Sequence, residues 1–127
     1  MTRNDAIKGI RIDTFGTTKF DTTVTEQFQN TVLRPILKFQ NDLFLVLFKQ
    51  YISKYAKDFG NMKLERKIEF VQNTFQKDMK FRNLNIGIAL GLFLDEELKI
   101  YFENKSEYNK RIISMLSERI VSQLQML

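Results

Sequence analysis

The chain has 127 residues, of which 43% are hydrophobic and 28% charged, and its formal net charge is +5. This length and balance predict one globular domain with a core of its own and exclude a disordered chain. Cysteine and histidine are both absent, which excludes disulfides, thiol catalysis, and the commonest general base and transition-metal ligand.

Residues 1–22 lack helical periodicity, and we expect them to form an extended N-terminal arm. Ile10 and Ile12 alternate with charged residues in a weak strand-like pattern. No secretion signal opens the chain, so we expect a cytoplasmic protein. The apolar residues of the arm are too many for a solvated tail, so it should dock on its own bundle or on another subunit or partner: Ile7, Ile10, Ile12, Phe15 and Phe20.

The remaining residues, 23–127, are expected to form the bundle domain. Thr23 followed by Glu26 matches a capping box, so the first helix should begin there and continue to about Lys57. Pro35 lacks an amide hydrogen, which should kink or break that helix near residues 31–35. Two apolar stripes predict burial on more than one side: Phe28, Val32, Ile36, Phe39, Leu43 and Leu47, and then Leu33, Leu37, Phe44, Phe48, Tyr51 and Tyr55.

The turn at residues 58–61 precedes an amphipathic helix over residues 62–80. Gly60 suits a left-handed helix end, and Asn61 can cap the helix that follows. The apolar face of that helix should contain Leu64, Ile68, Val71, Phe75 and Met79, and the opposite side Lys63, Arg66, Lys67, Lys77 and Lys80.

A central buried helix is expected over residues 81–93. Gly87 and Gly91 share one face of it, which predicts either close helix packing or a pocket lined by backbone. The apolar stretch from Leu84 to Leu94 is too short to span a bilayer, which takes about 20 residues.

Two further helices complete the prediction of an all-α bundle of five to six helices with an extended N-terminal arm. Asp95, Glu96 and Glu97 suit the acidic first turn of a short helix that ends near Asn104. Ser106 should cap the last helix, over residues 107–125, whose apolar stripe is Ile112, Ile113, Leu116, Ile120 and Leu124.

No pattern in the chain points to a cofactor, a metal or catalytic residues. Three consecutive carboxylates, Asp95 to Glu97, point in different directions on a helix, so a shared metal site is not expected. Serine or cysteine nucleophiles paired with histidine are excluded by composition, and no glycine-rich phosphate loop is present.

The basic side of the 62–80 helix is the candidate partner-binding site. Its cations could bind phosphates, and the phenylalanines among them could stack on bases. A solvated face is the alternative interpretation, because Glu65 and Glu69 lie on the same helix. The candidate residues are Arg66, Lys67, Phe70, Lys77, Lys80, Phe81 and Arg82.

Arg82 would turn toward the apolar side if the 62–80 helix continued through it. A buried arginine needs an acidic partner, such as Asp78 or Asp42, or a bound anion. We therefore expect either a polar network or, if the helix ends first, a surface arginine. The network would consist of Gln40, Asn41, Asp42, Arg82 and Asn83.

The segments FQNTVLRPILKFQNDLF, QKDMKFRN, GLF with the following EE, and NKRI resemble a family of small bacterial proteins of the Bacteroidetes type. The resemblance covers nearly the whole chain, including MTRNDAIKGIRIDTFGTTKF. The family has no established mechanism, and some members carry the label glyoxalase. That label implies a lyase or isomerase, but metal-dependent glyoxalases use histidine ligands that this chain lacks.

These observations favour a small non-catalytic binding or accessory protein. Its partner would be RNA, for example in the ribosome, or an acidic protein surface, contacted through the basic helix face and the arm. A homo-oligomer that exchanges its arms is one alternative. The other is a metal-free lyase or isomerase, with Arg82, Asn83 and Asp42 lining a closed pocket.

Overall fold

The computed structural model describes residues 1–11 and 23–127, and within these ranges it contains helices and no strand. The predicted all-α class is therefore confirmed. None of the described helices is long and apolar enough to cross a membrane. The α-helices are α1 (Arg3–Ile10), α2 (Val24–Phe28), α3 (Arg34–Phe39), α4 (Asn41–Tyr55), α5 (Leu64–Lys77), α6 (Met79–Leu90), α7 (Asp95–Glu103) and α8 (Lys105–Val121).

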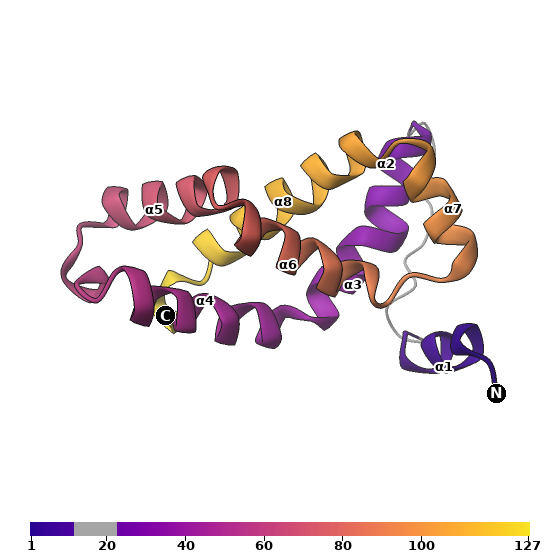
Figure 1. Cartoon of the computed structure of the whole chain (residues 1–127), viewed down its shortest axis with the longest axis horizontal. Helices are drawn as coiled ribbons and strands as arrows, with labels where there is room; N and C mark the ends of the chain where they lie inside the picture. Colours follow the sequence, from indigo (N-terminus) through magenta and orange to yellow (C-terminus); the bar gives the residue numbers. More distant parts are fainter. Residues whose placement is uncertain (12–22) are drawn as a thin grey trace.

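The helices form an elongated bundle (Figure 1). A short 3-10 turn, η2 (Phe59–Asn61), joins α4 to α5 at one end of the long axis, and α1 and α7 lie at the other end. Helix α8 runs back along the molecule and contacts both α5 and α6. A second 3-10 turn, η3 (Leu124–Met126), follows α8 near the C-terminus.

The expected extended arm is wrong over its first part, because residues Arg3–Ile10 form a helix. The Thr2 hydroxyl accepts the amide of Asp5, and the Asp5 carboxylate accepts the amide of Thr2, so a capping box starts α1. Residues 12–22, which include the rest of the expected arm and of its strand-like pattern, lie outside the described residues.

The helix that begins after Thr23 is interrupted near residues 31–35, where Pro35 predicted a kink or break. A π-helical turn, η1 (Gln29–Leu33), ends two residues before Pro35, and the Arg34 amide bonds to the Gln29 carbonyl five residues back. The Thr31 hydroxyl donates to the Gln27 carbonyl at 2.8 Å, an alternative to the regular ladder that bends helices. A second break at Gln40, which the sequence did not reveal, separates α3 from α4.

One apolar core runs through the bundle. At one end the Phe48 ring lies 5.6 Å from Phe75 and 5.8 Å from Phe81. At the other end Phe28 lies 4.5 Å from Tyr108 and 5.8 Å from Phe93. The predicted stripe of the last helix is confirmed for its four buried members, Ile112, Ile113, Leu116 and Ile120, whereas Leu124 is half-buried in η3.

Several predicted helix ends are wrong. Gly60 is not in the left-handed region, and Asn61 does not cap α5, whose N-cap position is Lys63. The last helix begins at Lys105 rather than after Ser106. Between α4 and α5 the chain forms the 3-10 turn η2 instead of a glycine-ended helix, with the Asn61 amide bonded to the Asp58 carbonyl and the Met62 amide to the Phe59 carbonyl.

The glycine pair does not serve close helix packing. Gly87 is exposed, and a side chain there would meet no atom within 4 Å. Gly91 ends α6, and a side chain there would meet only backbone carbonyls of its own helix, the nearest at 3.3 Å. The Gly91 carbonyl instead accepts a hydrogen bond from Arg3, which gives this glycine a role at the helix end.

Candidate anion-binding surfaces

The predicted basic face does not continue from α5 into α6, because α5 ends at Lys77. Asp78 has extended backbone geometry, and its side chain accepts the Phe81 amide at 3.1 Å to start α6. Lys80, Phe81 and Arg82 therefore belong to a new helix whose faces are not those of α5.

The cations of α5 lie on its outer side. Arg66 is exposed and lines a pocket of about 230 Å³ together with Glu69 and Phe70. Lys67 lies over the Phe59 ring, 5.4 Å from its centroid, in a cation–π contact that fixes it to the η2 turn. Lys77 is exposed at the C-terminal end of the helix, where a cation complements the helix dipole.

Neither phenylalanine of the candidate site is free to stack on a base. Phe81 is 9% exposed, and its ring lies 4.6 Å from Tyr51. Phe70 is half-buried and packs edge-on against Phe48 and Phe59. The helix breaks at Asp78, so Phe81 turns into the core and does not lie on the basic side, whereas Phe70 packs against the core and still borders the pocket of Arg66.

Arg82 is half-buried and lines a groove of about 390 Å³ between α8 and the α5–α6 pair. Its Nη1 donates to the Phe75 carbonyl at 3.4 Å. Lys110 lies on the α8 side of the same groove, so two cations share it. The rest of the polar lining consists of one carboxylate, Glu118, and the uncharged side chains Gln72, Gln76, Ser114 and Ser117.

The expected network of Gln40, Asn41, Asp42, Arg82 and Asn83 is not formed. Asp42 and Asn83 are exposed, and neither lines the groove of Arg82. Arg82, Asn83 and Asp42, all among the described residues, therefore do not line one pocket, as the lyase or isomerase alternative would require. Asn41 instead pairs with Gln123 near the C-terminus, with two hydrogen bonds of 2.8 Å.

Asp78 has a second role besides capping α6. The Tyr51 hydroxyl donates to its carboxylate at 2.7 Å, and this bond, with the Phe81 amide, lowers the pKa of Asp78. Burial, reinforced by the bond to Asp78, raises the pKa of Tyr51 to about 12. The contact links α4 to the start of α6, next to Lys80, which lines the same shallow groove.

The Tyr51 contact predicts a specific loss of stability in alkali. Tyrosine ionises near pH 10 in an unfolded chain, whereas folded Tyr51 holds its proton to about pH 12. Its stabilising contribution is therefore complete below about pH 10 and is lost as the pH rises toward 12. Urea unfolding from about pH 9 to about pH 11.5 should show a smaller loss for Tyr51→Phe than for the wild type.

The exposed Tyr55 provides the matched control for this measurement. Tyr55→Phe should keep the wild-type loss over the same range. An identical alkaline slope for Tyr51→Phe and the wild type would contradict the assignment.

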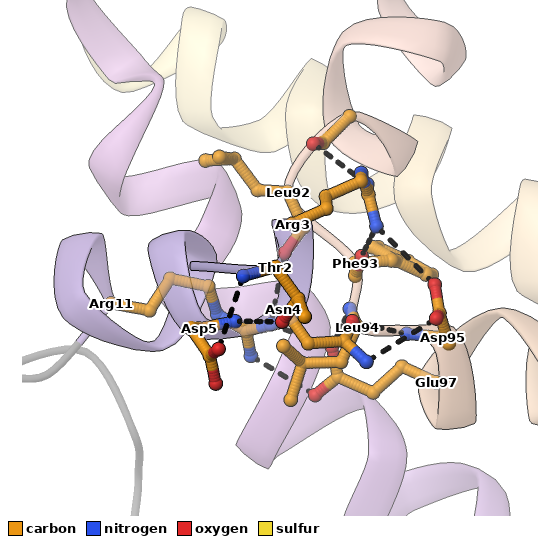
Figure 2. A network of polar contacts seen from close by, with 11 residues as sticks. Thr2, Arg3, Asn4, Asp5, Arg11, Leu92, Phe93, Leu94, Asp95 and Glu97 are labelled. Atoms are coloured by element: carbon orange, nitrogen blue, oxygen red, sulfur yellow. Dashed lines mark hydrogen bonds and ion pairs between the residues drawn. The ribbon is translucent and has the colours of Figure 1, made fainter.

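The N-terminal helix makes the most extensive polar contact between distant parts of the described chain (Figure 2). Arg3 donates to the carbonyls of Phe93 at 2.8 Å and Gly91 at 3.1 Å. Arg11 donates to the carbonyl between them, Leu92, at 2.9 Å. Two cations therefore bind the carbonyls that follow α6, where the helix dipole is negative.

Arg11 also forms a bidentate ion pair with Glu97, at 2.6 Å and 3.1 Å. The Arg11 side chain is 0% exposed, and that of Glu97 is 12% exposed. Asn4 adds two bonds to Asp95, at 3.1 Å and 3.2 Å. These contacts show the beginning of the arm docked on its own bundle, one of the two expected sites.

Sequence reasoning did not identify Arg3 and Arg11 as docking residues. Arg3 is the first residue of α1 and Arg11 is its C-cap residue, so their common role depends on a helix in a segment that was interpreted as extended.

The acidic run at the start of α7 has the predicted capping role. Asp95, Glu96 and Glu97 all lie in its first turn, and Glu97 accepts the Leu94 amide at 2.8 Å. The helix ends at Glu103 with Asn104 as its C-cap, as predicted. Within residues 1–11 and 23–127, no group of three acidic side chains is placed to hold a metal ion.

A second basic cleft was not anticipated from the sequence. Arg34 of α3 and Arg119 of α8 line an opening of about 430 Å³ with Leu37, Met115, Glu118 and Ser122. Burial and the nearby charge of Arg34 lower the pKa of Arg119. Helix periodicity could have placed each arginine on its helix, but not the two helices side by side.

Comparison of the chain with protein-family models, curated proteins and solved structures gives no match. The function is therefore argued from the residues and their geometry.

Proposed function

We propose that this protein is a small cytoplasmic binding protein without catalytic activity that attaches to an anionic macromolecule, RNA first of all. The observation that carries the proposal is that the candidate cations form no ion pairs with the described carboxylates. The ion pairs found among the described residues use Arg3, Arg11 and Arg111. The candidate cations Arg66, Lys67, Lys77, Lys80 and Arg82 form none with a described carboxylate.

Several acidic residues have partners elsewhere in the chain and do not pair with these cations. Several carboxylates bind groups of their own chain: Asp5 and Asp78 cap helices, Asp95 and Glu97 hold α1, and Glu107 pairs with Arg111. Asp95 and Glu97 lie at the α1–α7 end of the bundle, away from the outer side of α5, whereas Asp78 stays charged close to Lys80. A surface with unpaired cations raises the local concentration of an anionic partner and speeds its association.

The proposed contact depends on charge rather than on base stacking, because Phe70 and Phe81 pack in the core. Backbone phosphates meet this requirement, and an acidic protein surface is the second candidate for the same reason. The exposed Lys8 and Ile10 of α1 would extend the contact. Figure 1 places α1 and α5 at opposite ends of the long axis, and an extended strand suits that separation better than a compact partner.

A charge-matched pair of variants tests this proposal. Replacing Arg66, Lys77, Lys80 and Arg82 with glutamine should weaken binding of a fluorescent single-stranded RNA about tenfold or more. The slope of log K against log salt should also fall by about 0.7 for each lost phosphate contact. Fluorescence anisotropy at several salt concentrations measures both quantities.

The control replaces four other exposed lysines with glutamine: Lys49, Lys57, Lys99 and Lys105. Equal weakening by both variants would show that net charge alone attracts RNA and would reject the assigned surface. Binding of polyglutamate but not RNA, lost only in the first variant, would move the partner to an acidic protein. A concentration-dependent mass that is lost on deleting residues 1–22 would support the arm-exchanged oligomer instead.

A further inference from the structure

The cleft between α3 and α8 brings two arginines together without an acidic partner. Arg34 is exposed and Arg119 is half-buried, and neither forms an ion pair with a carboxylate in the part of the chain that the structure describes. Glu118 also lines the cleft but pairs with neither of them. Two guanidinium groups and one carboxylate leave the lining positively charged, which favours an anion.

Neighbouring side chains hold Arg119 in place. Its Nη1 donates to the Asn41 Oδ1 at 3.5 Å, and the same oxygen accepts the Gln123 Nε2 at 2.8 Å. The Arg119 carbonyl accepts both the Ser122 hydroxyl, at 2.7 Å, and the Gln123 Nε2, at 3.0 Å. These bonds join the end of α8 to the start of α4 and fix the backbone of Arg119, while one contact, to Asn41, reaches its guanidinium.

We propose that this cleft binds a phosphate monoester through Arg34 and Arg119. A guanidinium presents a planar fork of donors that matches two phosphate oxygens, and two forks suit a compact dianion. The opening of about 430 Å³ exceeds what a phosphoryl group fills, so the ester's organic part has room against Leu37 and Met115. The Ser122 hydroxyl oxygen remains able to accept a bond from the ligand.

This chemistry has two sources: a free phosphorylated small molecule, or the terminal phosphate of an RNA strand. The proposal does not depend on the α5–α6 surface, because no residue of that surface lines the cleft. The two proposals can therefore fail separately.

The test uses the full chain and follows the arginine Nε–H resonances by NMR while inorganic phosphate is added at constant ionic strength. The Arg34 and Arg119 signals should shift and saturate. Sulfate, a tetrahedral dianion that stays unprotonated near neutral pH, serves as a comparison anion. In Arg34→Gln, the phosphate affinity obtained from the saturable shift at Arg119 should be about tenfold weaker, because one charge-assisted contact is lost. Arg82→Gln, in the other groove, should leave it unchanged.

Arg34 is exposed, so Arg34→Gln should remain folded and keep the test valid if Arg119→Gln does not fold. Ribose 5-phosphate and a short RNA with and without a 5′-phosphate then distinguish the sources. Tighter binding of ribose 5-phosphate supports the small molecule, and tighter binding of the 5′-phosphorylated RNA supports the strand end. Shifts that do not saturate, or that saturate at the same phosphate concentration in Arg34→Gln as in the wild type, would overturn the proposal.

Discussion

Replacing Glu97 with alanine should lower the free energy of unfolding by about 3–5 kcal/mol, the usual loss when one partner of a buried ion pair is removed. Arg11 is 0% exposed and would keep its charge without the carboxylate that binds both its terminal nitrogens. The Leu94 amide would lose its acceptor as well. Urea unfolding measures the loss, and hydrogen exchange should show faster opening of the α1 amides.

Glu96→Ala provides the control, because Glu96 lies in the same helical turn and is exposed. It removes the same charge from the N-terminus of α7 and should cost only about 0.3–1 kcal/mol. The double variant Arg11→Met/Glu97→Met removes both charges together and should be more stable than Glu97→Ala. Equal stabilities of Glu97→Ala and Glu96→Ala would contradict the role assigned to the pair.

The second large effect is expected at Phe48, where Phe48→Ala should destabilise the protein by about 3–5 kcal/mol. The ring is 0% exposed and lies within 6.2 Å of the rings of four other aromatic residues. Its removal leaves a cavity that these rigid side chains cannot fill completely. The neighbouring rings are Tyr51, Phe70, Phe75 and Phe81.

The same substitution at Phe39 tests whether the effect comes from burial. Phe39 is 48% exposed at the end of α3, so Phe39→Ala should change the free energy of unfolding by about 0.5 kcal/mol or less. Both variants are compared by the urea midpoint at constant slope. Similar losses at the two positions would contradict the core described here.

The sequence predicted the class of fold because strong helical periodicity reports burial directly. It could not say which of the two apolar stripes of residues 23–57 is buried at each point. Ile36 and Leu37, from different stripes, are both buried in α3, but the stripe residues buried in α4 are Phe44 and Phe48, while Leu43 is exposed. The break at Gln40 changes which face of the segment is turned toward the core, and no proline or glycine in the sequence marks this break.

The candidate site was predicted less well, because it depended on one helix boundary. Asp78 was considered as an ion-pair partner, whereas its carboxylate caps α6 and binds Tyr51. That boundary separates Arg66 from Arg82 and turns Phe81 into the core. Long-range contacts such as those of Arg11 with α7 leave no local pattern, so only the three-dimensional structure reveals them.

The π-helical turn at Gln29–Leu33 sets the rotational phase of everything before it. A π turn holds one more residue than the helix around it, and one residue corresponds to about 100° of helical rotation. Without it, Phe28 would turn away from Phe93 and Tyr108, the rings that it now contacts. Deleting one residue from Gln29–Leu33 would therefore restore a regular helix and keep α2 in phase, because the π turn accommodates one extra residue while both halves of this segment face one core.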